Sequence, residues 1–165
     1  MRKTICFVSY FSFISMLLSG CASPPTPEEM ETSRQRVYEF TNSKDEAMYR
    51  LSELLTSRVA FKDYSAQSYD EKQKGPLGLE PRKLKYKIKG INTYGIIFTS
   101  YEYGFKGNYY YEEPFRSESV PFQKSAIDFS VGSAMIRMGP YLFSAANRKK
   151  TIDAYHFLMY LSENN

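Results

Sequence analysis

The chain has 165 residues, with 22 lysines and arginines against 18 aspartates and glutamates, and a formal net charge of +4. This length fits one domain that buries its core without disulfides. The single histidine excludes a site built from several imidazoles, and we predict neither a metal nor a cofactor.

The first 20 residues have the pattern of a secretion signal. Arg2 and Lys3 precede an apolar stretch of 14 residues, Ile5 to Leu18, which ends in two small residues. This stretch is shorter than the roughly 20 apolar residues that span a bilayer. We therefore expect residues 1–20 to be a cleaved signal peptide. Cleavage also removes Cys6, so the remaining cysteine has no partner for a disulfide.

The cysteine that follows this segment is part of a more specific motif. In Leu18-Ser19-Gly20-Cys21, an apolar residue and two small residues precede the cysteine, and the motif resembles the lipobox of bacterial lipoproteins. The resemblance implies cleavage before Cys21, a diacylglyceryl thioether on its sulfur, and a third chain such as palmitate on its amine. Several acyl chains hold a protein stably at a bilayer. The alternative is an ordinary signal peptide followed by an unrelated cysteine.

The residues after Cys21 indicate which membrane holds the protein and where a linker lies. Lipoproteins with Asp after the cysteine tend to stay in the inner membrane, whereas this chain has Ala22. The resemblance thus implies a chain anchored in the outer membrane. We expect it to face the periplasm, and the cell surface is the alternative. Residues 21–33 are expected to be the lipidated cysteine and a flexible linker, because they are rich in Pro, Ser, Thr and Glu; extended, they reach about 35–40 Å. A secreted chain does not meet nucleic acid, so nucleic acid is excluded as a partner.

Residues 34–165 are expected to form one domain, which begins with a strand and a helix. Alternation predicts a short strand over Arg36–Phe40. A helix over residues 43–59 follows, with Ser43 as N-cap and Glu46 completing a capping box. Residues 60–69 are predicted as a strand, and residues 70–81 as a polar loop because of their glycines and prolines.

The second half of the chain shows strand patterns and then one helix. Residues 82–89 alternate lysines with apolar residues, as a half-buried strand does. Residues 94–105 change register, which predicts a bulge near Ser100, and Gly107-Asn108 predicts a hairpin turn that returns through residues 109–111. A loop is expected over residues 114–124, a strand from Ile127 to Val131, and a helix over residues 146–162 capped by Asn147 or Ser144. Residues 132–145 fit either a strand or a helix.

This order of elements predicts the α+β class: a single antiparallel sheet of about five or six strands with two helices packed on one face. The segment RVYEFTNSKDEAMYRLSELLTSRVAFKDY, residues 36–64, resembles the opening of small TBP-like domains of unknown function in secreted bacterial proteins. That resemblance brings no functional residues with it.

The sequence contains no strong catalytic motif. Asp153 and His156 are three residues apart on a predicted helix and are most simply a surface pair. Gly132-Ser133-Ala134 lacks the elbow that exposes a nucleophilic serine, and no phosphate-binding glycine motif occurs. The acidic pairs at residues 28–29, 70–71 and 112–113 are in polar contexts. We predict no catalytic residue; an envelope hydrolase is the least favoured hypothesis.

Two features remain that can bind a partner. The predicted strand over residues 82–89 has a lysine face that either contacts anions or protects a sheet edge. The hairpin over residues 94–111 holds six tyrosines and two phenylalanines, too many for one buried face; they either stiffen the sheet through cross-strand pairs or contact a partner. The candidate partner-binding residues are Tyr101, Tyr103, Tyr109, Tyr110, Tyr111, Lys85, Lys87 and Lys89.

These features favour a non-enzymatic, lipid-anchored lipoprotein that acts as an interaction or accessory module for another protein of the cell envelope. The alternative is a module that binds an envelope glycan or lipid through the tyrosine-rich hairpin and the lysine-faced strand. A deep apolar pocket would favour that alternative.

Overall fold

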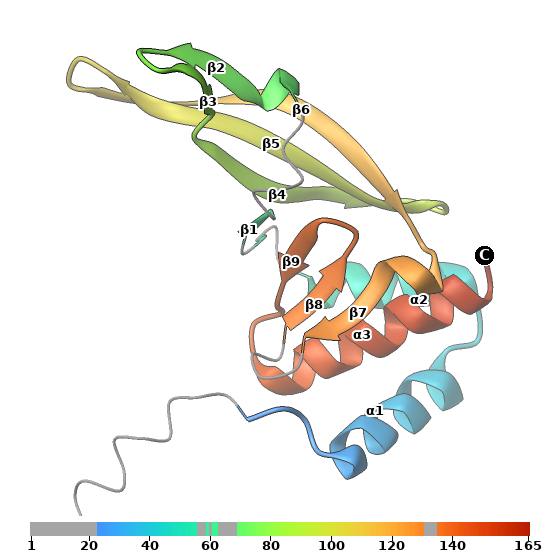
Figure 1. Ribbon diagram of the computed structural model, residues 1–165. Helices are drawn as coiled ribbons and strands as arrows, with labels where there is room; N and C mark the ends of the chain where they lie inside the picture. Colours follow the sequence, from blue (N-terminus) through green and yellow to red (C-terminus); the bar gives the residue numbers. More distant parts are fainter. Residues whose placement is uncertain (1–22, 56–58, 60, 63–68, 131–134) are drawn as a thin grey trace, which may run out of the picture.

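The computed structural model describes residues 23–55, 59, 61–62, 69–130 and 135–165 (Figure 1). Cys21 and the signal segment lie outside these residues. The elements in chain order are α1 (Pro27–Phe40), α2 (Lys44–Leu54), β1 (Phe61–Lys62), η2 (Tyr69–Glu71), β2 (Lys72–Gly75), β3 (Gly78–Pro81), β4 (Leu84–Ile91), β5 (Gly95–Lys106), β6 (Tyr109–Pro121), η3 (Lys124–Ala126), β7 (Ile127–Ser130), β8 (Met135–Met138), β9 (Tyr141–Phe143) and α3 (Arg148–Glu163).

The α+β class is confirmed, but the predicted single sheet with two helices is wrong. In the described residues the strands form three antiparallel sheets, ordered β1-β9-β8-β7, β4-β5-β6 and β2-β3, beside three α-helices. The two larger sheets are separate because β6 ends at Pro121, after which η3 leads the chain into β7. Proline has no amide hydrogen with which to continue a ladder.

Helix α1 corrects two predictions. It covers Arg36–Phe40, predicted as a strand, and residues 27–33, predicted as part of the flexible linker. Its start is fixed by a capping box, in which the Thr26 hydroxyl accepts from the Glu29 amide and the Glu29 carboxylate accepts from the Thr26 amide. Its buried residues Ser33 and Val37 face α3, so tertiary packing selects the helix.

Helix α2 is confirmed with its predicted N-cap, since the Ser43 hydroxyl accepts from the Glu46 amide at 3.1 Å. The predicted capping box is displaced by one residue, because the Glu46 carboxylate accepts from the Asn42 amide at 3.3 Å. The helix ends at Leu54 rather than at residue 59, and the Leu55 amide donates to the Leu51 carbonyl.

The body of the molecule consists of the four-stranded sheet and the three helices (Figure 1). The strand predicted from Ile127 is confirmed as β7, and β8 and β9 occupy described parts of residues 132–145, where the sequence left strand and helix open; Val131 and residues 132–134 lie outside the description. Helix α3 is confirmed with Asn147 as its N-cap. The body core includes Leu51, Ile136, Met138, Phe143, Leu158 and Leu161, each fully buried.

The sheet β4-β5-β6, called the projecting sheet below, lies over the body, and its free end extends beyond it (Figure 1). The predicted strand over residues 82–89 is confirmed as β4. The bulge is confirmed in position, as a register shift between Ser100 and Tyr101, but it does not bring the two halves of β5 into one register. The extra residue is Phe115 of β6, because Ser100 pairs with Arg116 and Tyr101 with Pro114. The loop predicted over residues 114–124 is wrong: β6 continues through Pro114 to Pro121, since an edge strand tolerates proline at a bulge.

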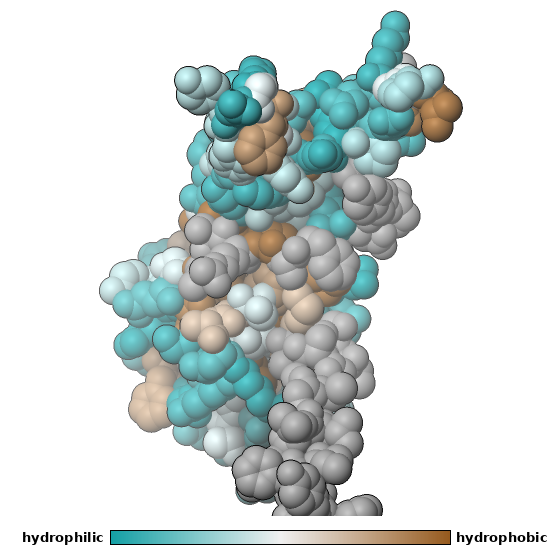
Figure 2. Space-filling model, turned by 90° about the vertical axis from the view of Figure 1, so that its left-hand side faces the viewer, coloured by the Kyte–Doolittle hydropathy of each residue, from teal (hydrophilic) through white to brown (hydrophobic). Residues whose placement is uncertain are grey.

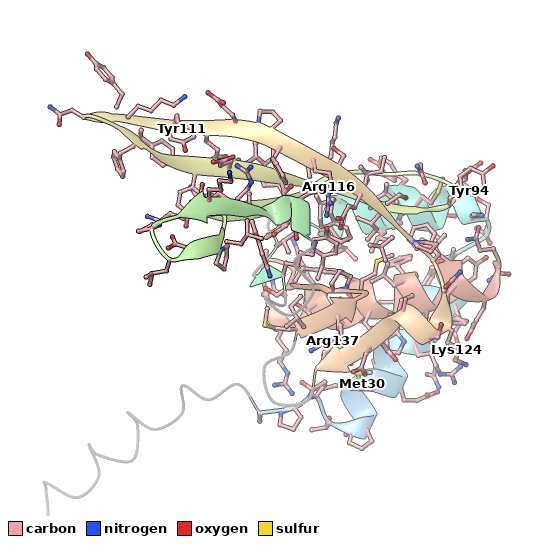
Figure 3. The ribbon with its side chains drawn as sticks, turned by 45° about the horizontal axis from the view of Figure 1, so that its top comes forward. Met30, Tyr94, Tyr111, Arg116, Lys124 and Arg137 are labelled. Atoms are coloured by element: carbon pink, nitrogen blue, oxygen red, sulfur yellow. The ribbon has the colours of Figure 1, made fainter. Side chains whose placement is uncertain are left out.

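The predicted loop over residues 70–81 is also wrong, because β2 and β3 form a hairpin there. Its turn uses Gly78 at a φ of 113°, a conformation that glycine adopts readily. The hairpin runs beside the free end of the projecting sheet (Figures 1 and 3). Arg82 helps to hold it there, because its guanidinium pairs with Glu102 of β5 at 2.8 Å and lies 4.9 Å from the centre of the Phe115 ring.

A charge cluster built around a buried ion pair, Lys62–Glu71, joins the projecting sheet to the body. The Glu71 carboxylate, 1% exposed, contacts the Lys62 ammonium at 3.0 Å and the Arg116 guanidinium at 3.3 Å. Glu118 completes the cluster, since it lies 3.5 Å from Lys62 and accepts from the Tyr141 hydroxyl. Burial raises the pKa of the Glu118 carboxyl, but the Tyr141 hydrogen bond and the two cations lower it further than burial raises it. We call Lys62, Glu71, Arg116 and Glu118 the junction cluster.

Candidate interaction surface

The aromatic residues in the second half of β5 lie on the face of the projecting sheet opposite to its buried face. Ile96, Phe98 and Ser100 are buried at alternate positions. The extra residue of the bulge belongs to β6, so the alternation of β5 continues and Tyr101, Tyr103 and Phe105 lie on the other face. We call this the outer face; its members are Lys85, Lys87, Tyr101, Tyr103, Phe105, Tyr110 and Glu112.

Two lysines of β4 lie along this outer face and reach across β5 to one glutamate of β6. The Lys85 ammonium lies 3.1 Å from the Glu112 carboxylate, and the Lys87 ammonium contacts its other oxygen. Hydrogen bonds from Lys87, Tyr110 and Lys85 lower the pKa of Glu112 to about 2. Hydrogen bonds to Tyr110 and Glu112 raise the pKa of Lys85. The two lysines are therefore bound within the sheet rather than free to pair with an external anion.

The same lysines lie against the tyrosine rings. The Lys87 ammonium is 4.6 Å from the centre of the Tyr101 ring, and the Lys85 ammonium is 4.7 Å from that of Tyr103 and 5.0 Å from that of Tyr110. These distances suit cation–π attraction. Tyr110 also packs edge-on against Phe105 at 5.7 Å between ring centres. The rings are thus held in fixed positions before any partner arrives.

Exposed aromatic and aliphatic side chains gather toward the free ends of the two hairpins. Phe105 is 73% exposed, Tyr109 82% and Leu77, at the β2–β3 turn, 96%. Figure 2 shows the projecting part, at the top of the view, as a mostly hydrophilic surface with separate hydrophobic residues. The arrangement offers isolated anchors rather than one continuous apolar patch.

The structure brings five of the eight candidate residues together on the outer face: Lys85, Lys87, Tyr101, Tyr103 and Tyr110. Tyr111 lies toward the free end of β6 (Figure 3) on the opposite face, where the Lys106 ammonium is 4.7 Å from its ring centre. Tyr109 is at the hairpin turn, and Lys89 is the extra residue at the irregularity between Ile88 and Gly90.

Sequence reasoning missed Glu112, which it treated as half of a solvated acidic pair. The available signal was alternation across the turn: Glu112 is two residues from Tyr110 and pairs with Tyr103, so it shares their face. Phe105 was also left out of the candidate residues, although it is two residues from Tyr103 and pairs with Tyr110 on the same face.

A cavity of about 510 Å³ lies between α1 and α3. Its lining includes Ser33, Arg36, Arg148, Lys149 and Asp153. The Ser33 hydroxyl donates to the Asp153 carboxylate at 2.7 Å, and Arg36 pairs with the same carboxylate. A nucleophilic serine is usually activated by a histidine or lysine that accepts its proton, whereas here the Ser33 hydroxyl donates to the Asp153 carboxylate. Ile152 is the one apolar residue among those that line it, and no tyrosine lines it.

His156 lies inside the helix pair α1–α3 instead of on its surface, which corrects the predicted surface pair with Asp153. It is 6% exposed, and its Nε2 atom has no hydrogen-bond partner among the described residues. Burial lowers the pKa of His156, while the charge of Asp153 and a hydrogen bond with the Met30 backbone oppose this. The folded protein therefore favours the neutral imidazole.

This burial predicts an acid-dependent loss of stability. Because the unfolded chain binds the proton more readily, the contribution of His156 is complete above about pH 6.5 and is lost as the pH falls below it, by at most about 1.4 kcal/mol per pH unit. Urea unfolding at pH 7.5 and 5.5 should show a larger loss in the wild type than in His156→Gln, which does not titrate. Equal losses in the two proteins would contradict this assignment.

Within the described ranges, no helix is long and apolar enough to cross a membrane, and no group of His, Cys, Asp and Glu is arranged to hold a metal ion. Comparison with known proteins finds no matching family, no matching curated protein and no matching solved structure.

Proposed function

We propose that this chain is a non-enzymatic lipoprotein, anchored in the outer membrane through acyl chains on Cys21 and facing the periplasm. It acts as an interaction or accessory module that contacts another envelope protein through the outer face of the projecting sheet. The observation that carries the proposal is the fixed tyrosine and lysine arrangement on a sheet that extends beyond the body.

The chemistry of this surface suits a protein partner. Tyrosine offers large contact area at a low cost in conformational entropy, and tyrosines are enriched in protein interfaces. On the outer face the rings are already positioned by Lys85 and Lys87, so less freedom is lost on binding. The pairing of both lysines with Glu112 favours a protein over the alternative, an anionic glycan or lipid bound by these lysines.

The charge distribution adds a property of the partner. Residues 72–121 contain nine lysines and arginines against five glutamates, a formal charge of +4, whereas residues 23–71 and 122–165 together have eleven against thirteen acidic residues, a formal charge of −2. Most of this positive charge is in residues 72–83, which have four lysines and arginines against one glutamate. A partner with an acidic surface would therefore be attracted to the β2–β3 hairpin beside the projecting sheet.

The place where the described chain begins supports an orientation in which the projecting sheet points away from the membrane. The segment before α1, where the described chain begins, lies on the far side of the body from the free ends of β5–β6 and β2–β3 (Figure 1). A lipid anchor just before Ser23 would direct the projecting sheet away from the bilayer, toward the periplasm.

Site-specific crosslinking in intact cells tests the proposal. A photoreactive residue at Tyr109, which is 82% exposed, should give a discrete crosslinked product, while one at Tyr94, 74% exposed at the opposite end of β5 (Figure 3), should not. Adding Tyr103→Ala and Tyr110→Ala should reduce the Tyr109 product at least tenfold, because such anchors contribute about 2 kcal/mol or more each.

The control for this experiment is the fold of the double variant. Its thermal midpoint should stay close to that of the wild type, since both rings are on the outer face, away from the body core. A crosslinked product of equal yield at Tyr94, or an unchanged yield in the folded double variant, would count against the outer face. A product that contains glycan or lipid instead of protein would favour the alternative.

A further inference from the structure

We propose that the N-terminal end of α3, whose first turn carries Arg148, Lys149 and Lys150, lies against anionic lipid headgroups of the bilayer that holds the chain. We call these three residues the basic cluster. The inference rests on the proposed lipid anchor, and it adds the surface by which the folded domain itself contacts the membrane.

Arg148 ties the start of the described chain to the body. Its guanidinium donates to the Ser23 and Pro24 carbonyls, to Pro24 at 2.9 Å, and pairs with the Glu29 carboxylate at 2.7 Å. The Arg148 and Thr26 hydrogen bonds lower the pKa of Glu29 to about 2, so this acid stays ionised over the ordinary pH range. The segment before α1 is therefore attached to the body through one arginine.

This attachment shortens the distance from the acyl chains to the domain. Ser23 is two residues after Cys21, and two extended residues span at most about 7 Å. The reach of about 35–40 Å expected of a free linker is not available while α1 and Arg148 hold Ser23 and Pro24. The surface around Arg148 must then lie close to the headgroups.

The other two members of the basic cluster, Lys149 and Lys150, do not contribute their charges to ion pairs within the described residues. Lys149 and Lys150 are exposed, and neither forms an ion pair with another described residue. Both are in the first turn of α3, which has no acidic residue, and the helix dipole disfavours cations at that end. Of the three acids that line the adjoining cavity with Lys149, Glu29 is paired with Arg148 and Asp153 with Arg36, and only Glu28 forms no ion pair with a described residue.

Cations within a Debye length of a bilayer, about 8 Å at physiological salt, are attracted to anionic headgroups. The acyl chains would supply the attachment and the basic cluster the orientation. Held in this way, the domain keeps its projecting sheet on the side away from the membrane, which the proposed partner contact requires.

Lysine labelling in vesicles tests the inference. Full-length acylated protein is placed in vesicles of phosphatidylcholine, with or without phosphatidylglycerol, and treated briefly with an amine reagent that does not cross membranes. Lys149 and Lys150 should react several-fold more slowly when phosphatidylglycerol is present, and high salt should abolish this protection. Lys72 and Lys74, exposed on β2, serve as internal controls and should react at one rate in all vesicles.

The substitution Arg148→Gln removes the guanidinium that holds the segment before α1 to the body. It should lengthen the free linker and reduce the protection of Lys149 and Lys150, whereas Lys124→Gln, an exposed lysine in η3, should leave it unchanged. Protein that floats with the vesicles but shows equal labelling of all four lysines overturns this inference alone. Protein that does not float overturns the proposed anchor as well.

Discussion

Replacing Glu71 with leucine should lower the free energy of unfolding by about 3–5 kcal/mol, because it leaves a buried cation without its main partner. The Lys62 side chain is 3% exposed and lies 3.0 Å from Glu71, while its other carboxylate, Glu118, is 3.5 Å away. The substitution also removes a contact of Arg116 at 3.3 Å. A loss of this size is a large part of the 5–15 kcal/mol that typically stabilises a domain. Urea unfolding followed by circular dichroism measures it.

Two controls separate the burial of the charge from other effects. Glu113→Gln removes an acid that is 66% exposed and 3.7 Å from Lys106, and should change stability by less than about 0.5 kcal/mol. The double variant Lys62→Met with Glu71→Leu replaces the pair by apolar groups and should recover much of the loss. A Glu71→Leu protein within about 1 kcal/mol of the wild type would show that the junction cluster is not a stabilising element.

Replacing Cys21 with alanine should reduce the incorporation of labelled palmitate to background, because the proposed thioether needs the Cys21 sulfur. Two or more acyl chains make release from a bilayer very slow, so loss of the sulfur removes stable attachment altogether. The body and the projecting sheet contain no cysteine, and the domain should keep its thermal midpoint.

The matched control is Cys6→Ala, in the predicted signal peptide, which should leave palmitate incorporation unchanged. Fatty-acid incorporation is the better readout, since an uncleaved precursor can remain in the membrane through its apolar segment. Equal incorporation in Cys21→Ala and in the wild type would place the acyl group on another residue and would contradict the proposed outer-membrane anchor at Cys21.

Elements with strong local signals were predicted well from the sequence. Helix α2 has a serine cap and one apolar stripe, and β4 alternates lysines with apolar residues; both form where the pattern indicates. Helix α1 was missed because five alternating residues, Arg36–Phe40, were given more weight than the cap at Thr26. Threonine, proline and a glutamate three residues after the threonine are a helix-start signal, and packing on α3 completes the helix.

The arrangement of the sheets was beyond local patterns. Strand β1 pairs with β9, with Phe61 opposite Leu142, and nothing within either segment specifies a partner so distant in the sequence. For the same reason, the sequence alone could not show how the candidate residues of different strands lie relative to one another. Alternation predicts that Tyr101 and Tyr103 share a face and that Glu112 shares one with Tyr110, but only the register of β5 with β4 and β6 shows that these residues meet on one face of the sheet.

Mass spectrometry of the N-terminal peptide of the mature protein, isolated from its native membranes, tests the central claim most directly. If the chain is anchored as proposed, this peptide begins at Cys21 and has the added mass of a diacylglyceryl group and an amide-linked fatty acid. A mature protein that begins at another residue, or at an unmodified Cys21, would contradict the anchor and, with it, the proposed orientation of the projecting sheet.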